Sequence, residues 1–399
     1  MVDFNIVGIN ILVALAFMGF MYKQKPMARV AEKVLVVNEE GEELERIIPA
    51  AEFTKRLVIF PFDPKDEKVD NNIRIGVPLL ASIDIEQNPT QFVSSGINLK
   101  SRYSKYNRDI SENVPFSVKK QIAIDRFADL FITGEYQIEN EKIILDLKCY
   151  TSKDGRELFQ DKIEADNLFE LTDKITAAYT ENLYTADHVN SNFETFQDLP
   201  ANSLVTNNLE AFTSFINGAI LSEHESKFEA GIQELEKSVI IDQNCAECAI
   251  TLSNLYMAVN NGPKSMELAN KSMDNVAVLS ERQQLRIKAG YYLRNSEMNK
   301  ALTLFEMWRQ LYPNNLEPYA NLIQFYPMMG ETQKAIEVGK DAVANGLSGN
   351  FLLSIANLLA NENQFQEAEE YFFKFQEEFP EKASGRTNPE GASHTFIVN

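Results

Sequence analysis

A unit of about 34 residues recurs through the C-terminal half of the chain, and this period constrains the fold more than any other feature. Five consecutive copies begin at Phe212, Ala246, Arg282, Leu316 and Gly349. Such a period is typical of helix hairpins that stack side by side, because no single hairpin can bury its own apolar face. The alternative is an irregular helical bundle, which would not produce five copies in register. The sequence therefore predicts an all-α solenoid over residues 205–381.

Small and large apolar residues stand at fixed positions of each copy. In the clearest copy they are Leu285, Ala289, Tyr292, Ala301, Phe305, Trp308 and Pro313. Small residues let two antiparallel helices approach closely, and large ones fill the space between neighbouring hairpins. This pattern resembles the tetratricopeptide repeat (TPR) family. The resemblance implies a curved solenoid whose concave side is lined by the first helix of each hairpin and holds a peptide or helix of another protein.

Polar residues fall at first-helix positions that would face this groove. They are Asn254, Arg286, Arg294, Gln324, Asn357 and Asn361. Amide side chains can pair with a peptide backbone, and an arginine can bind a carboxylate through two parallel hydrogen bonds. Arg286 and Arg294 are slightly more than two turns apart on one predicted helix, so both are expected to reach one acidic segment. The alternative for each residue is an ordinary solvated side chain.

Residues 4–22 carry no charge and would form a helix of roughly 28 Å, long enough to cross a bilayer. Lys23, Lys25 and Arg29 follow directly. A cleaved signal peptide and a buried core helix are alternatives, but Asp3 stands where a signal peptide is basic, and no convincing cleavage site follows. We therefore expect residues 1–25 to be a single-pass transmembrane anchor and residues 26–54 to be a linker.

Residues 55–190 predict an α/β domain. Strands are expected over residues 56–63, 128–138, 142–151 and 157–163, and helices over residues 71–82, 114–128 and 168–183. The polar stretch between Ile83 and Val114 is expected to be a long loop. The fold class is thus multidomain: a transmembrane helix, an α/β domain and an all-α solenoid, followed by a flexible tail over residues 382–399.

Several short segments of this domain resemble the TolB amino-terminal-like domain, which bacteria often place between a membrane span and TPRs. They are Ile59 to Phe62, the Thr133–Gly134 step, the turn in Tyr150 to Leu158, and Leu168 to Ile175. The resemblance implies a protein of the bacterial inner membrane. Basic residues follow the span and none precedes it, which favours a cytoplasmic body; a domain upstream of Met1 would favour the periplasmic side equally.

No catalytic, cofactor or metal site is evident from the sequence. The residues after the first predicted strand, PFDPKDEKVDNN, lack the glycine-rich turn that brings backbone N–H groups to a nucleotide phosphate. Cys245 and Cys248 form one CxxC without a second pair or a nearby histidine to complete a zinc site. The net charge of −20 would repel a nucleic acid.

The expected function is therefore that of a non-enzymatic, membrane-anchored scaffold or sensor module that binds a protein partner in the solenoid groove. The family that the middle domain resembles often carries a kinase or a DNA-binding domain before the membrane span. A second interpretation is the extracytoplasmic sensory half of such a signalling protein. A third is a redox enzyme or hydrolase that uses Cys245 and Cys248.

Overall fold

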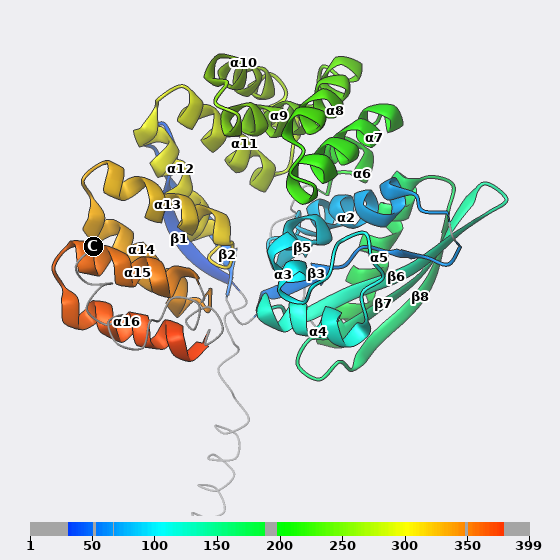
Figure 1. Cartoon of the computed structure of the whole chain (residues 1–399), viewed down its shortest axis with the longest axis horizontal. Helices are drawn as coiled ribbons and strands as arrows, with labels where there is room; N and C mark the ends of the chain where they lie inside the picture. Colours follow the sequence, from blue (N-terminus) through cyan, green and yellow to red (C-terminus); the bar gives the residue numbers. More distant parts are fainter. Residues whose placement is uncertain (1–30, 51–52, 67, 188–197, 348–349, 379–399) are drawn as a thin grey trace, which may run out of the picture.

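The computed structural model describes residues 31–50, 53–66, 68–187, 198–347 and 350–378. They form a β-hairpin, an α/β domain and a helical solenoid that curves beside that domain (Figure 1). The predicted membrane helix over residues 4–22 and the predicted tail over residues 382–399 lie outside these ranges. Within the ranges, no helix combines the length and the apolar character needed to cross a bilayer.

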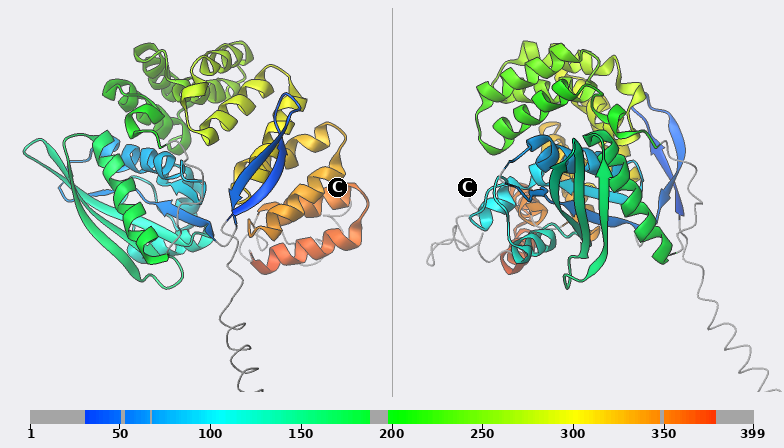
Figure 2. Two further views of the ribbon diagram at one scale, coloured as in Figure 1. Left: turned by 180° about the vertical axis from the view of Figure 1, so that it is seen from behind. Right: turned by 90° about the vertical axis from the view of Figure 1, so that its right-hand side faces the viewer.

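The hairpin consists of β1 (Ala31–Val37) and β2 (Glu43–Pro49), which pair in antiparallel register. Its buried residues Val36 and Ile48 join the apolar core of the solenoid, and β1 lies against α12 (Met298–Leu311; Figure 2). The predicted linker over residues 26–54 is therefore wrong for this segment. This segment has few apolar residues among many charged ones. The helix that buries them, α12, lies far along the chain, so the local sequence does not reveal the hairpin.

The α/β domain is built on one mixed sheet in the order β5-β3-β6-β7-β8, with β4 paired to β6. Its strands are β3 (Lys55–Ile59), β4 (Asp63–Pro64), β5 (Gln91–Ser95), β6 (Leu130–Glu139), β7 (Lys142–Thr151) and β8 (Glu157–Ala165). The strand β3 is parallel to both β5 and β6, whereas β6, β7 and β8 form an antiparallel meander. The strands β5 and β8 are consequently the two edges.

Helices cover both faces of this sheet. They are η2 (Asn72–Gly76), α2 (Val77–Ile85), η3 (Gly96–Leu99), α3 (Lys100–Lys105), α4 (Phe116–Asp125) and α5 (Leu168–Asp187). The helices α2 and α5 pack on one face, where Leu80 and Ile175 belong to the same apolar core as Ile132. The helices α3 and α4 pack on the other, where Tyr103 and Ile122 lie among strand residues.

The strands and helices predicted for this domain are confirmed, apart from the long loop between Ile83 and Val114. That stretch contains β5, η3 and α3. The strand β5 has only Phe92 and Val93 as apolar residues, which is too few for a local strand signal. Phe92 is buried because it joins the core of the solenoid and not that of its own domain.

The solenoid consists of five helix hairpins preceded by α6 (Ala201–Leu204). The hairpins are α7 (Leu209–Ala219) extended by η4 (Ile220–His224) with α8 (Phe228–Ile241), α9 (Ala246–Ala258) with α10 (Gly262–Met273), α11 (Glu281–Arg294) with α12, α13 (Leu316–Met328) with α14 (Thr332–Ala344), and α15 (Asn350–Asn361) with α16 (Phe365–Glu378). A short turn, η5 (Val276–Val278), joins α10 to α11. The predicted repeat register is confirmed, because Ala289, Ala301 and Trp308 are all buried.

Ala301 tests this register directly. The Ala301 side chain is 0% exposed on α12, within the core that α11 and α12 share. We expect Ala301→Leu to overpack this contact and to lower the free energy of unfolding by about 1–3 kcal/mol. Asn299→Leu is the matched control, because Asn299 is exposed on the same helix. Thermal unfolding of Ala301→Leu at the wild-type temperature would contradict the register.

Candidate functional site: the cavity between the α/β domain and the solenoid

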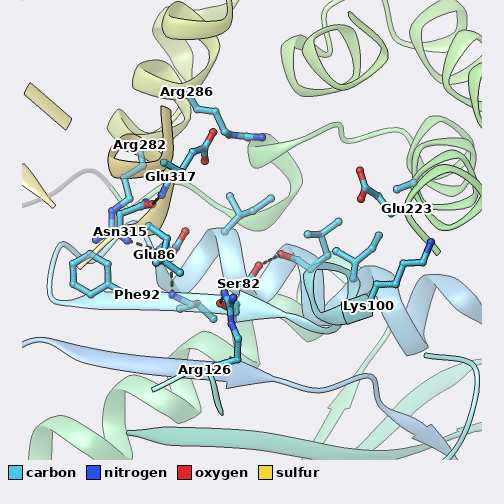
Figure 3. Close-up of a pocket in the computed structure, with 18 of the residues that line it drawn as sticks. Ser82, Glu86, Phe92, Lys100, Arg126, Glu223, Arg282, Arg286, Asn315 and Glu317 are labelled. Carbon is cyan, nitrogen blue, oxygen red and sulfur yellow. Dashed lines mark hydrogen bonds and ion pairs between the residues drawn. The ribbon is translucent and has the colours of Figure 1, made fainter. Parts of the chain in front are cut away.

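A cavity of about 980 Å³ lies between the α/β domain and the concave side of the solenoid (Figure 3). The first helix of every hairpin contributes to its lining, through Phe215 of α7, Thr251 of α9, Arg286 of α11, Glu317 of α13 and Phe351 of α15. The α/β domain contributes α2, β3 and β5. The concave side is therefore not an open groove, because the chain's own α/β domain forms the opposite wall.

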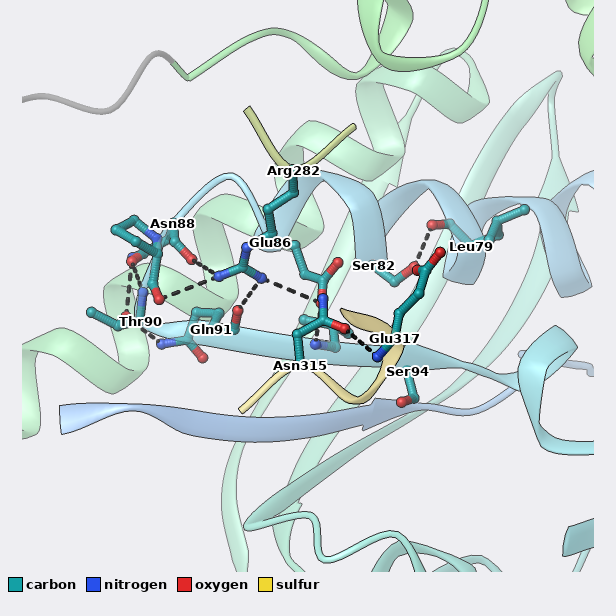
Figure 4. A network of polar contacts seen from close by, with 12 residues as sticks. Leu79, Ser82, Glu86, Asn88, Thr90, Gln91, Ser94, Arg282, Asn315 and Glu317 are labelled. Atoms are coloured by element: carbon teal, nitrogen blue, oxygen red, sulfur yellow. Dashed lines mark hydrogen bonds and ion pairs between the residues drawn. The ribbon is translucent and has the colours of Figure 1, made fainter. Parts of the chain in front are cut away.

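Arg282 of α11 holds the two walls together (Figure 4). It is only 7% exposed, and its Nη1 donates a hydrogen bond of 2.6 Å to the Gln91 carbonyl oxygen of β5. The same nitrogen lies 3.4 Å from the Glu86 carboxylate. The guanidinium carbon lies 4.7 Å from the ring centre of Phe92 and 4.2 Å from that of Tyr312. The charged side chain of Arg282 thus joins the solenoid to the edge strand β5.

Two further contacts fix the α/β domain against the solenoid. The Arg56 guanidinium of β3 donates 2.7 Å hydrogen bonds to the Asn345 carbonyl oxygen and to Asn314 Oδ1. At the other end of the sheet, His224 Nε2 lies 2.8 Å from the Ile97 carbonyl oxygen. The contact at Asn345 comes from the fourth hairpin and the contact at His224 from the first. The α/β domain is therefore held at two separate points along the solenoid.

Two of the six predicted groove residues, Asn254 and Arg286, line this cavity. Arg286 pairs with Glu247 of α9, and Arg294 Nη2 donates a 2.5 Å hydrogen bond to Asn254 Oδ1. Both arginines thus contact side chains of α9, and their joint binding of an acidic partner segment stays a prediction. The remaining three residues, Gln324, Asn357 and Asn361, are exposed on α13 and α15 and are not among the lining residues.

Arg286 also has a partner within the solenoid. Its guanidinium already neutralises Glu247, whose side chain is only 4% exposed. Truncation of Arg286 would leave that carboxylate buried without its partner, so the variant would lose stability as well as a cavity-facing charge. The binding role of the six residues stays a prediction.

Several cavity residues escaped the sequence analysis, and Arg126 is the clearest. Its Nη2 donates a 3.0 Å hydrogen bond to Ser94 Oγ, whereas its buried Nε has no partner in the part of the chain that the structure describes. Burial lowers the pKa of Arg126, and the nearby Arg102 lowers it further. Lys100 lines the same region of the cavity. No local pattern marks these cations, because tertiary contacts bring them together.

The cavity is also lined by the carboxylates of Glu86 and Glu317. Burial raises the pKa of Glu86, against the opposing effect of Arg282. Burial likewise raises the pKa of Glu317, which Arg286 opposes. Burial alone would lower the pKa of Arg286, but the carboxylates of Glu247 and Glu317 raise it above its usual value. Charges of both signs therefore lie beside backbone groups and apolar side chains, which suits a polypeptide ligand.

A second cavity, of about 650 Å³, lies beside α4 on the meander β6–β8. At its base, Lys119 Nζ lies 2.7 Å from Asp63 Oδ2, and Arg74 Nη1 lies 3.6 Å from Asp63 Oδ1. All three side chains are buried. The base of this cavity is therefore a buried ion cluster.

The cysteines offer no exposed thiol. Cys245 and Cys248 form a disulfide at the start of α9, and both are buried. Cys149 is buried in the sheet, which raises the pKa of its thiol to about 12. In the described ranges, no group of three or more His, Cys, Asp and Glu side chains is placed to hold a metal ion.

Comparison with known proteins gives fold likenesses at low identity. No protein-family model matches the sequence, and no curated protein matches it. Among solved structures, the chain is similar to MamA, with 22% identity over 42% of this chain and 96% of that one and a TM-score of 0.33. It is also similar to TTC0263, a thermophilic TPR protein of Thermus thermophilus, with 16% identity, 44% and 94% coverage and a TM-score of 0.34.

A third similar structure is the C-terminal domain of LpoB from Salmonella enterica, with 10% identity, 28% and 83% coverage and a TM-score of 0.24. These values assign no function to the chain. The five hairpins and the buried repeat positions carry the fold assignment. The C-terminal part of the chain is a TPR-like solenoid, joined to an α/β domain and a β-hairpin.

Proposed function

We propose that the protein is a non-enzymatic, membrane-anchored scaffold that holds a segment of a partner protein in the cavity between its α/β domain and its solenoid. The single observation that carries this proposal is the lining of the cavity: all five first helices, the part of a TPR solenoid that faces its ligands, converge on it. The opposite wall adds a sheet edge and charged side chains, so a bound segment would contact both units.

The resemblance of the α/β domain to the TolB amino-terminal-like family supports a place at the bacterial inner membrane. In this proposal residues 4–22 span the bilayer, and the β-hairpin connects the span to the outer side of the solenoid. Lys288 of α11 pairs with Glu39 of the hairpin turn at 2.7 Å, and Arg46 of β2 pairs with Glu281 of α11 at 2.6 Å. The solenoid, and not only the α/β domain, would therefore lie close to the anchor.

The anchor can be tested by fractionation. We expect the full chain to stay with membranes after a carbonate wash, and a chain without residues 1–25 to become soluble. Leu12→Arg places a charge in the middle of the uncharged segment and should release the protein at an insertion cost of about 3 kcal/mol. Recovery of the unaltered chain in the soluble fraction would contradict the anchor.

The proposed role of the cavity in partner binding can be tested by filling it with a large side chain. Ala320 of α13 is exposed and lines the cavity, so Ala320→Trp should occupy the space of a ligand without overpacking a core. Ala344→Trp is the matched control, because Ala344 is exposed on α14 and is not a lining residue. After co-purification from native membranes, we expect the protein retained by the wild type and by Ala344→Trp to be lost from Ala320→Trp. Equal retention by all three would move the partner site elsewhere.

A further inference from the structure

Neighbouring hairpins of the solenoid contact each other at the repeat position that follows Phe305 in the clearest copy. The equivalent residues of the first four copies are Glu236, Asn270, Glu306 and Lys340. Each of them reaches the following hairpin: Glu236 lies 3.2 Å from Lys264 Nζ, Asn270 accepts a 3.0 Å hydrogen bond from Asn295, Glu306 accepts a 2.6 Å hydrogen bond from Tyr326, and Lys340 Nζ lies 2.6 Å from Glu367. This position therefore marks the surface of each hairpin on which the next hairpin packs.

In the fifth copy the same position is Phe373 of α16, whose side chain is 53% exposed. Phe365 lies slightly more than two turns earlier and is 40% exposed. Glu369 lies between the two phenylalanines, Glu377 follows Phe373 by about one turn, and both glutamates are exposed. Residues four apart share one face of a helix, so these four side chains form a row, which we call the α16 stripe.

Phe373 lies on the side of α16 that faces away from the fourth hairpin. Lys340 of α14 pairs with Glu367 and lies 6.0 Å from the ring centre of Tyr371, so these two residues mark the side turned to the fourth hairpin. Ala368 joins the apolar core with α15 and marks the side turned to that helix. At 3.6 residues per turn, Phe373 points away from both sides. Figure 1 shows α16 as the last helix of the solenoid in the described part of the chain.

The helix α11 shows how a basic helix stacks on a hairpin in this chain. Its Ile287 joins the apolar core of the second hairpin, together with Ala269 of α10. Arg286 of the same helix pairs with Glu247 of α9. The contact between these two hairpins thus combines an apolar side chain with an ion pair. The α16 stripe offers the same two kinds of group, aromatic rings and carboxylates, and among the described residues no helix follows α16 to cover them.

Two other occupants fit the α16 stripe less well than a basic helix. Two prolines and two glycines are spread through residues 379–399, so the sequence that follows α16 does not predict a helix. A second copy of the chain, packed through the same surface, would bring the glutamates of both stripes together, and like charges repel. A helix that carries lysine or arginine would instead neutralise Glu369 and Glu377.

We propose that the α16 stripe binds a basic amphipathic helix of another protein, which stacks on the fifth hairpin where the first helix of a further hairpin would lie. Its large apolar side chains would pack on Phe365 and Phe373, and its lysines or arginines would pair with Glu369 and Glu377. None of these four residues lines the cavity, so the inference goes beyond the proposed function.

A peptide of known sequence serves as the probe. It is a fluorescein-labelled peptide of residues 281–294, the basic helix α11, held helical by a hydrocarbon staple. Two control peptides differ in one property each: the first carries Ile287→Ser, and the second carries Arg286→Glu with Arg294→Glu. We expect the probe to bind the full chain and each control peptide to bind at least about tenfold more weakly. Equal binding of all three peptides would overturn the proposal.

Variants of the full chain locate the bound probe. Phe373→Ser should weaken probe binding at least about tenfold, whereas Ile240→Ser, at a position 71% exposed on α8, should not change it. Glu369→Lys with Glu377→Lys should weaken binding of the probe and strengthen binding of the peptide with two glutamates, because the charges are exchanged. Glu370→Lys is the matched control, since Glu370 is exposed on the same helix outside the stripe. Unchanged affinity of Phe373→Ser for the probe, or no gain from the charge exchange, would overturn the proposal.

The two other occupants have their own signatures. Phe396→Ser with Val398→Ser, made in the full chain, should leave probe binding unchanged; a gain of more than about tenfold would make the chain's own tail the occupant and overturn the proposal. Analytical ultracentrifugation should give the wild type and Phe373→Ser the same mass. A dimer that forms in the wild type and is lost in Phe373→Ser would make a second copy the occupant and would equally overturn it.

Probe binding and partner capture respond to different variants. Ala320→Trp should lose the membrane partner and keep probe binding, whereas Phe373→Ser should lose probe binding and keep that partner, because α16 does not line the cavity. If Ala320→Trp keeps the partner, the cavity function fails while binding at α16 stands. If Ala320→Trp abolishes probe binding, the probe lies in the cavity, and the proposal for the α16 stripe is overturned.

Discussion

Arg282→Ala is expected to lower the free energy of unfolding by about 3–5 kcal/mol and to separate the α/β domain from the solenoid. The substitution removes the hydrogen bond to the Gln91 carbonyl oxygen and the stacking on Phe92 and Tyr312. It also leaves the carboxylate of Glu86 without its cation in a site where burial already raises its pKa. Chemical denaturation measures the first effect, and an increased radius of gyration in solution scattering measures the second.

Two controls separate the role of Arg282 from a general effect of removing an arginine. Arg294→Ala alters the same helix, but Arg294 donates to Asn254 within the solenoid, so we expect a loss of only about 1 kcal/mol. The double variant Arg282→Ala with Glu86→Gln removes the unpaired charge and should recover part of the loss. Compact scattering by Arg282→Ala, with unchanged stability, would show that the two units are joined by other contacts.

Lys119→Met is expected to cost about 3–5 kcal/mol, although it replaces a charged side chain by an apolar one of similar length. Lys119 is 6% exposed, and Asp63, its partner at 2.7 Å, is 5% exposed. Without the lysine, the ion pair that Asp63 keeps among the described residues is the longer one to Arg74, at 3.6 Å. Equilibrium unfolding in denaturant measures the loss.

The matched control for this cluster is Lys120→Met, because Lys120 is the neighbouring residue of α4 and is only partly buried. It should change stability by less than about 0.5 kcal/mol. The double variant Asp63→Asn with Lys119→Met removes both charges and should be more stable than Lys119→Met alone. A double variant that is no more stable would show that the lost lysine mattered through its packing and not through its charge.

The parts of the fold that the sequence predicted depend on contacts between neighbours in the chain. Ala301 and Trp308 pack within one hairpin, so the repeat pattern places them without knowledge of the rest of the molecule. The β-hairpin and β5 were missed because their buried residues, Val36 and Phe92, reach a core that is formed far along the chain. Short polar strands of this kind carry almost no periodic signal of their own.

The candidate site was predicted only in outline for the same reason. The pattern placed Arg286 and Asn254 on the concave side, and they line the cavity there. It could not show that Glu247 neutralises Arg286, or that Arg282, which began a predicted repeat, reaches β5. Nor could it place Arg126 in the lining of the cavity, because the cavity exists only once the α/β domain sits against the solenoid.

The most direct test of the central claim is site-specific photo-crosslinking in native membranes. A benzophenone amino acid would be placed at Ala258 or Ala320, two exposed residues that line the cavity, and at Ala177 or Ala344, two exposed residues outside it. We expect one protein to crosslink from both cavity positions and from neither outer position, and to disappear when Ala320→Trp accompanies the probe at Ala258. Crosslinks that form from the outer positions alone, or equally from all four, would contradict the account.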